Sequence, residues 1–166
     1  MKKLIAHPFK LALIAVLVTS GIALAANPHF LRSAVTLLSN GNLRFSWKEV
    51  GLGDAETTYL AGATTTVTCT CVTNSGRCPN AANKRTFTRD VSNQGTFDPK
   101  NGQITASLVV QAPACGSSAP PTCGGVQHLE LSAIRYTDFF LIDVTNGVAA
   151  NGPFPDSLSA TYFTCP

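Results

Sequence analysis

Hydrophobic and polar residues alternate one by one along several segments of the chain. Leu43, Phe45 and Trp47 alternate with arginine, serine and lysine, and the segment 104–110 repeats this pattern. A period of two places the apolar side chains on one face of an extended strand. The pattern therefore predicts strands with one buried face at 43–48 and 104–110.

The middle of the chain contains a run of β-branched residues. Between Thr64 and Val72 every residue is threonine, valine or cysteine, and branching at Cβ disfavours a helix. The segment Asn74–Lys84 has the glycine, proline and asparagine residues of a loop. We expect a long run of strand before this loop.

Turn residues divide the following segment. Strands are expected at 86–91 and 95–97, and the segment Asp98–Gly102 then contains the pair Asn101-Gly102 between apolar residues. An Asn-Gly pair in this position is a strong signal for a two-residue hairpin. The sequence thus predicts a hairpin between 95–97 and 104–110.

The second half of the mature chain continues the β pattern. A loop rich in proline, glycine and serine spans Ala112–Gly125, and the apolar phase then shifts between Leu131 and Ile134, which a bulge or tight turn would explain. Strands follow at Phe139–Val144 and Leu158–Thr164. With about eight or nine short strands and frequent turn signals, the predicted fold is all-β: a single immunoglobulin-like antiparallel β-sandwich, stapled by disulfides.

The N-terminus has the features of a signal peptide. Lysines precede an apolar segment that starts at Leu11 and ends in Ala23-Leu24-Ala25, so we expect cleavage after Ala25 and a secreted domain at 26–166. The alternative, an uncleaved anchor, is disfavoured because the segment is shorter than the ~20 residues of a membrane span. Localisation is predicted as secreted or extracellular, with the periplasm as the alternative.

Removal of residues 1–25 changes the charge of the protein. Three of the 12 lysines and arginines lie in the leader, so the mature chain has nine positive and nine negative residues. A nucleic-acid or acidic-membrane role loses its main support. We expect no nucleic-acid partner and no membrane span after cleavage.

The chain has an even number of cysteines, all of them in the mature part. In an exported chain these predict three disulfides, although the sequence leaves the pairing open. Cys69 and Cys71 should lie on one face of a strand and bond to different partners. A metal site formed by Cys69, Cys71 and Cys78 is the alternative, but the spacing is not typical of zinc and no histidine lies nearby. The expected disulfide residues are Cys69, Cys71, Cys78, Cys115, Cys123 and Cys165.

An ordered series of short motifs runs through most of the mature chain: Asn27-Pro28-His29-Phe30, Phe45-x-x-Lys48-Glu49-x-Gly51-Leu52-Gly53, Cys71-x-x-Asn74 and Lys100-Asn101-Gly102. The series resembles a group of small secreted bacterial proteins, mostly uncharacterised, that are predicted to be β-sandwiches. The resemblance implies a shared bridge between Cys71 and Cys123. It implies no activity, substrate or catalytic residue.

The search for catalytic groups finds no convincing set. The mature chain has only His29 and His128, and it lacks the elbow motif of a serine hydrolase. His128 and Glu130 could be a base and its orienting acid, but a solvent-exposed strand pair explains them better. We predict no catalytic, cofactor-binding or metal-binding residues, and no cofactor.

Acidic and basic residues offer only weak candidate sites. The carboxylates have no recognisable context for glycoside hydrolysis, for which two opposed acids are needed, and the turn at Asp98 lacks the ligands of a calcium loop. A small basic cluster around Phe87 is explained by a charged strand edge better than by nucleic-acid binding. The carboxylates considered are Asp54, Glu56, Asp138 and Asp143, and the basic cluster is Lys84, Arg85 and Arg89.

The leading functional hypothesis is a non-catalytic exported protein that binds a protein, a surface glycan or a matrix. Its contacts would be made by the loops Asn74–Lys84 and Ala112–Gly125, because exposed loops on a rigid frame often carry binding. One alternative is a pilin-like assembly subunit, since Gly152 precedes an alternating C-terminal segment with Leu158, Ala160 and Tyr162. Another is a small secreted hydrolase or enzyme inhibitor.

Overall fold

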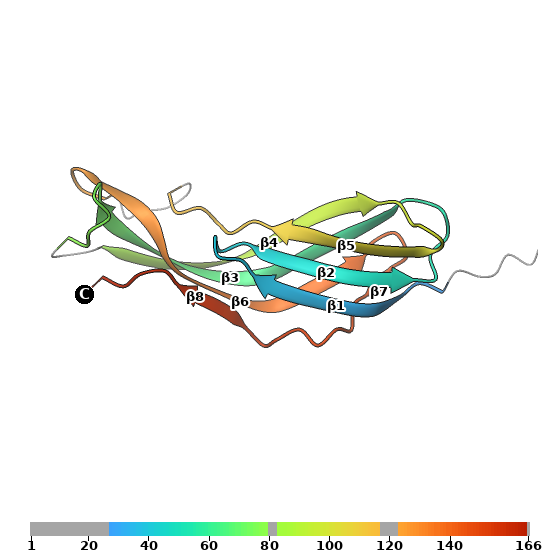
Figure 1. The fold of residues 1–166 in the computed structure, drawn as a ribbon. Helices are drawn as coiled ribbons and strands as arrows, with labels where there is room; N and C mark the ends of the chain where they lie inside the picture. The colour runs from blue at the N-terminus through green and yellow to red at the C-terminus, as the bar shows by residue number, and fades with distance from the viewer. Residues whose placement is uncertain (1–26, 80–82, 117–122, 166) are drawn as a thin grey trace, which may run out of the picture.

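The computed structural model describes residues 27–79, 83–116 and 123–165, which form two antiparallel sheets without a helix (Figure 1). In these residues, no helix is long and apolar enough to cross a membrane. The expected signal peptide lies outside the described residues and stays a prediction. The strands are β1 (His29–Leu37), β2 (Leu43–Val50), β3 (Thr57–Thr73), β4 (Lys84–Phe97), β5 (Gln103–Val110), β6 (Gln127–Asp143), β7 (Val148–Ala149) and β8 (Leu158–Thr161).

The strands divide into a three-stranded and a five-stranded sheet. The three-stranded sheet has the order β1-β2-β5, and the five-stranded sheet has the order β4-β3-β6, with β7 and β8 both paired to the far edge of β6. Every strand pair is antiparallel. The all-β prediction is therefore confirmed, together with the three disulfides.

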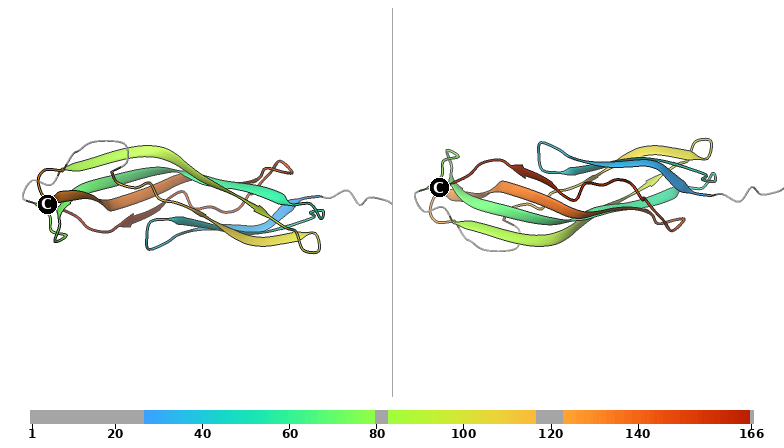
Figure 2. Two further views of the ribbon diagram at one scale, coloured as in Figure 1. Left: turned by 90° about the horizontal axis from the view of Figure 1, so that it is seen from above. Right: turned by 90° about the horizontal axis from the view of Figure 1, so that it is seen from below.

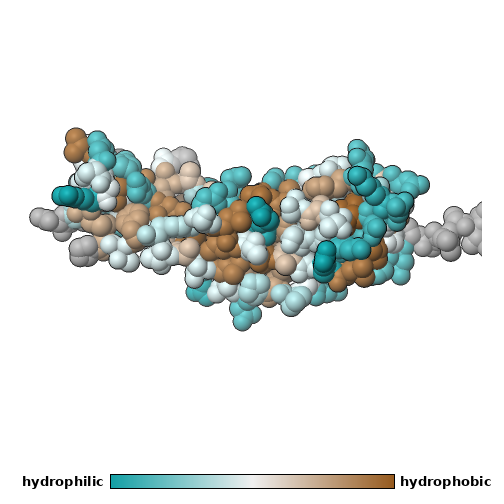
Figure 3. All heavy atoms as spheres, viewed as in Figure 1, coloured by the Kyte–Doolittle hydropathy of each residue, from teal (hydrophilic) through white to brown (hydrophobic). Residues whose placement is uncertain are grey.

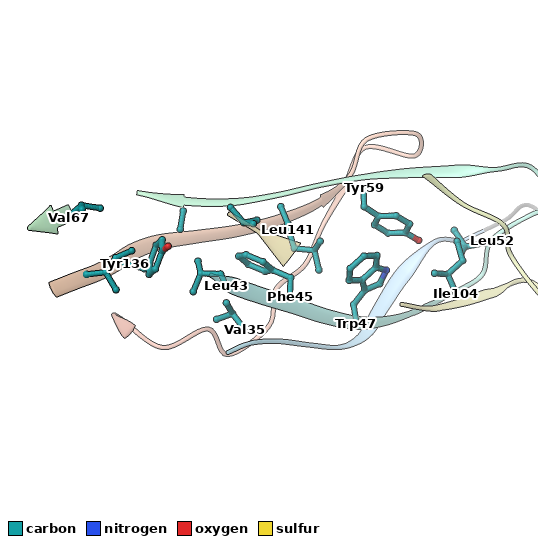
Figure 4. Close-up of a cluster of buried hydrophobic side chains, with 14 of the residues drawn as sticks. Val35, Leu43, Phe45, Trp47, Leu52, Tyr59, Val67, Ile104, Tyr136 and Leu141 are labelled. Carbon is teal, nitrogen blue, oxygen red and sulfur yellow. The ribbon is translucent and has the colours of Figure 1, made fainter. Parts of the chain in front are cut away.

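Buried side chains from both sheets form one hydrophobic cluster (Figure 4). Leu43, Phe45 and Trp47 alternate into it from β2, as their spacing predicts, and Tyr59 enters from β3. The rings of Trp47 and Tyr59 lie 4.7 Å apart between centroids. Large aromatic side chains remove much apolar surface from water, so this cluster is the main stabilising contact between the sheets.

The five-stranded sheet is much longer than the three-stranded sheet. Strands β3 and β6 have 17 residues each, whereas β2 and β5 have eight, which corresponds to about 55 Å against about 26 Å. The three-stranded sheet consequently faces only one part of its partner (Figure 2). We call the end of the five-stranded sheet that is formed by 66–73, 84–88 and 127–132 the overhang.

Three predictions about strand length need correction. The segments 86–91 and 95–97 are one strand, β4, and the expected strand at Phe139–Val144 is the continuation of β6. The strand predicted at Leu158–Thr164 ends at Thr161. Strands β3, β4 and β6 are long, so the expectation of uniformly short strands is wrong, although the described part of the chain has eight.

Strand β6 is continuous although its pairing with β3 contains two bulges. Its register against β3 shifts by one residue at Ser132 and again near Asp138, which has a φ of 53°. The first bulge accounts for the phase shift between Leu131 and Ile134, so that prediction is confirmed. Bulges increase the local twist of a sheet, and the long ribbons of the overhang are visibly twisted in Figure 1.

The predicted hairpin at Asn101-Gly102 is wrong in its pairing. Both residues have positive φ, 53° and 70°, and the backbone NH of Lys100 donates to the Gln103 carbonyl at 2.8 Å, so the tight turn itself is present. However, β4 pairs with β3 and β5 pairs with β2, and only Lys100 and Gln103 bridge across the turn. Pro99 lacks an NH to continue a ladder, and the chain crosses from one sheet to the other.

Candidate functional site

Three disulfides hold the chain together at the overhang. Cys69 and Cys71, both buried on the inner face of β3, bond to Cys115 and Cys123 respectively. They therefore reach different partners, as expected from their position on one face of a strand. The Cys71–Cys123 bond is the one that the sequence resemblance implies.

The third disulfide fixes the C-terminal segment at the same end. Cys165 bonds to Cys78 in the loop after β3, and the ammonium group of Lys84 donates to the Cys165 carbonyl. The alternative of a cysteine metal site is wrong, because all six sulfurs are in disulfides. The three disulfides thus tie described residues of the loop after β3, the loop after β5 and the C-terminal segment to one end of the molecule.

The candidate binding loops are partly described. In the loop after β3, the Thr73 hydroxyl donates to the Arg77 carbonyl at 3.2 Å and accepts from the Arg77 backbone NH at 3.1 Å. In the loop before β6, Val126 is 73% exposed. An ordered turn and an exposed apolar side chain therefore lie at the end that the disulfides hold. Residues 80–82 and 117–122 of these loops lie outside the described residues.

Comparison with protein-family models, with curated proteins and with solved structures finds no match.

His128 and Glu130 are brought together on the outer face of β6. Their side chains interact at 2.9 Å between Nε2 and Oε1, and each is 46% exposed. Among the described residues, neither side chain has another side-chain partner. The pair is a solvent-exposed contact of the kind that contributes little to stability.

The candidate carboxylates are dispersed. Asp54 and Glu56 are exposed between β2 and β3, and Asp98 is exposed next to the tight turn. Asp138 accepts a hydrogen bond from the Thr137 hydroxyl at the second bulge. Within the described residues, no group of three histidine, cysteine, aspartate or glutamate side chains could hold a metal ion.

Asp143 differs from the other candidates because it is completely buried. Its two carboxylate oxygens accept hydrogen bonds from the backbone and the side-chain amide of Asn146, at 3.0 and 2.6 Å. It lies close enough to Glu49 for the two carboxyl groups to interact. The structure therefore places a pair of acids inside the core.

Glu49 is the functional candidate that the sequence analysis missed. Its side chain is fully buried. Its Oε2 accepts a hydrogen bond from the Tyr59 hydroxyl at 2.6 Å, while its Oε1 has no hydrogen-bond partner among the described residues. Burial raises the pKa of Glu49 to about 7 and Asp143 adds to the rise, whereas the Tyr59 hydrogen bond and His29 oppose it. The alternation of Leu43, Phe45 and Trp47 continues to residue 49, so the signal for its burial was present.

This acid cluster lies in the interior rather than in a cleft. Burial and the neighbouring Glu49 carboxyl both raise the pKa of Tyr59 well above its ordinary value. The indole NH of Trp47, next to the Tyr59 ring, has no hydrogen-bond partner in the described structure. All four side chains are buried, and the raised pKa of Glu49 makes the cluster sensitive to pH.

The basic cluster predicted around Phe87 lies along the edge strand β4. The guanidinium of Arg89 is 6.0 Å from the centre of the Phe87 ring, and Asp90 accepts a hydrogen bond from the Thr64 hydroxyl. The edge of β4 thus carries charges of both signs, which is a known protection against unwanted strand pairing.

The C-terminal strand pairs within its own chain. Residues 158–161 of β8 pair with 133–136 of β6, and the chain then continues to the disulfide at Cys165. Upstream, Gly152 packs directly on Ser33 of β1, where a Cβ would lie 1.8 Å from the serine Oγ. One edge of β8 is thus occupied by β6 within the same chain.

Proposed function

We propose that the protein is an exported, non-catalytic binding protein with an immunoglobulin-like β-sandwich fold, and that it binds through its disulfide-tied end. The strand order supports the fold proposal, because β1-β2-β5 faces β4-β3-β6-β8 across a shared core as in immunoglobulin-like sandwiches. Three disulfides are typical of extracellular or periplasmic proteins.

One observation carries the binding proposal: all three disulfides hold the same end of the molecule. Where the two sheets face each other, hydrophobic packing already stabilises the fold. Disulfides in that region would therefore add little stability. At the overhang they immobilise loops instead, and loops held rigid lose less conformational entropy on binding. A rigid frame presenting ordered loops is a common design for recognition.

The experiment compares two loop variants of the mature protein 26–166. In the first, residues 74–77 and 124–126 are replaced by glycine and serine, leaving every cysteine in place. In the matched control, the loop 54–56 at the opposite end receives the same treatment. Binding to intact cells of the producing organism and to their envelope fraction is measured by co-sedimentation.

We expect the first variant to lose binding and the control to retain it. Retained binding after replacement of both tied loops would contradict the proposal. A stable fold of each variant is verified by its thermal unfolding and by a mass corresponding to three intact disulfides.

A further inference from the structure

The outward face of the three-stranded sheet carries charge of one sign only. Strand alternation places Arg32 of β1 and Arg44 and Lys48 of β2 on this face, opposite to the core. The only acid in the three strands is Glu49, which points into the core. The expected mature chain is formally neutral. The positive charge of this face therefore reflects where the charged residues lie and not a net positive charge of the chain.

The three cations lie in a compact arrangement without counter-ions. Arg32 and Lys48 are direct cross-strand partners, and Arg44 lies four residues before Lys48 on the same strand, a distance of about 13 Å. Like charges directly opposite each other destabilise a sheet. None of the three has an ion-pair partner in the described part of the chain, so the fold does not require this placement.

The outward face of the five-stranded sheet differs in this respect. There Asp90 and Glu130 accompany the cations, and they make hydrogen bonds with Thr64 and His128. A solvated surface of mixed sign is the ordinary condition of a protein. The single-sign face is therefore a property of one sheet and not of the whole surface.

The residues between the cations are mostly small and hydroxyl-bearing. Ser46 lies between Arg44 and Lys48 on β2 and is paired with Ser107 of β5, and Thr36 is paired with Arg44. No phenylalanine, tyrosine or tryptophan alternates outward on these strands. Figure 3 views this side of the molecule and shows strongly hydrophilic residues interspersed with hydrophobic ones over the three strands.

We propose that this face, formed by Arg32, Arg44, Lys48 and the hydroxyls between them, binds an acidic polysaccharide through its carboxylate groups. Charge complementarity carries the proposal: guanidinium groups bind carboxylates in bidentate geometry, and the serine and threonine hydroxyls match the hydroxyls of the sugar. A membrane surface is the competing partner that the test separates, because Leu31 of β1 is 57% exposed beside Arg32 and interfacial binding uses such side chains. This surface is separate from the disulfide-tied end, so the inference goes beyond the proposed function.

The test measures retention of mature protein on immobilised polygalacturonate, with neutral dextran as the reference polymer. The variant R32Q/R44Q/K48Q removes the three positive charges of the face. The control R89Q/K100Q/R135Q removes two arginines and one lysine elsewhere on the protein. Wild type and the second variant should bind polygalacturonate, and the first should bind at least tenfold more weakly. Binding should also disappear at 1 M salt, where screening shortens the Debye length to about 3 Å.

Several outcomes would overturn the proposal. Equal losses in both variants would show an effect of net charge alone, and equal retention on dextran would show that carboxylates are not recognised. Binding to phosphatidylglycerol vesicles, but not polygalacturonate, through the same three residues would identify a membrane surface instead. Because the tied loops are unchanged in both variants, these results are independent of the loop experiment.

Discussion

Replacement of Glu49 by glutamine tests whether the core contains a carboxyl group that is neutral at moderately acidic pH. Glu49 is fully buried and contacts the Tyr59 hydroxyl at 2.6 Å. Glutamine has nearly the same shape, and its carbonyl can accept the same hydrogen bond, but it cannot ionise. The variant therefore removes the charge while it retains the packing.

The sign of the effect follows from the two pKa values. The folded pKa of Glu49, about 7, is above its ordinary value of 4.5, so the folded protein binds the proton more tightly than the unfolded chain. Below pH 4.5 the group is neutral in both states. Between about pH 4.5 and 7 the unfolded chain ionises first, and the free energy of unfolding falls as the pH rises. At ~1.36 kcal/mol per pKa unit, the complete loss above pH 7 is about 3 kcal/mol.

The groups that face Glu49 come from three other strands. Tyr59 on β3, Asp143 on β6 and His29 on β1 all influence its pKa. Asp143 and His29 are present in both proteins, so the difference between wild type and variant isolates most of the Glu49 contribution. Tyr59→Phe is a second variant of use, because it removes the hydroxyl that lowers the Glu49 pKa. Its free energy of unfolding should therefore fall more between low and high pH than that of wild type.

The assay is urea unfolding followed by the fluorescence of Trp47, the single tryptophan. Near pH 4.5 the free energies of unfolding of wild type and Glu49→Gln should be similar. Near pH 8 the variant should be more stable by about 3 kcal/mol. The same pH dependence in both proteins, or a wild type that gains stability relative to the variant across this range, would refute the reasoning.

Three further changes test the packing and the bridges. Gly62→Ala should destabilise the fold by about 1–3 kcal/mol, because a Cβ there would lie 2.5 Å from a backbone oxygen of β4 and as close to an aromatic ring. The control Gly53→Ala meets nothing within 4 Å and should change stability little. Equal melting temperatures of the two variants would contradict this. Tyr136→Phe should cost about 1 kcal/mol by urea unfolding, since its buried hydroxyl donates to a backbone carbonyl at 2.8 Å; an unchanged midpoint would show that the bond contributes nothing. Serine at Cys78 and Cys165 opens a bridge of sequence separation 87 and should cost about 2–4 kcal/mol; wild type in reductant should match or exceed that loss.

Strand positions could be predicted from the sequence because alternation is a local property. The apolar residues of 43–48 and 104–110 lie on the core face as expected. Strand length could not be predicted in the same way, since a bulge interrupts the apolar phase without interrupting the strand. At Asp138 the interruption looks like the end of a strand in the sequence, although β6 continues to Asp143.

Partner choice was less accessible than turn geometry. The pair Asn101-Gly102 specifies a tight turn through its positive φ angles, and the turn is present. Which strands then pair depends on the apolar faces of distant segments. Strand β4 pairs with β3, whereas β5 pairs with β2 in the other sheet. A local signal that defines a turn does not define the sheets on either side.

The burial of Glu49 could be predicted only if the alternation of buried positions along β2 outweighed the usual exposure of glutamate. Glutamate is rarely buried without a partner, so Glu49 after Trp47 looks like the exposed end of a strand. The Tyr59 hydroxyl that donates to Glu49 and the Asp143 carboxyl that raises its pKa come from two other strands. Long-range contacts of this kind are not visible in a single sequence.

The uneven length of the two sheets explains why the disulfides are placed together. Over the covered region, hydrophobic contacts between sheets stabilise the fold, but the inner face of the overhang has no opposing sheet to bury it. Cys69 and Cys71 instead draw segments that follow β5 onto this face. Covalent bridges commonly stabilise regions where a core is too small. The same bridges fasten the described ends of the neighbouring loops, and the proposed binding depends on this property.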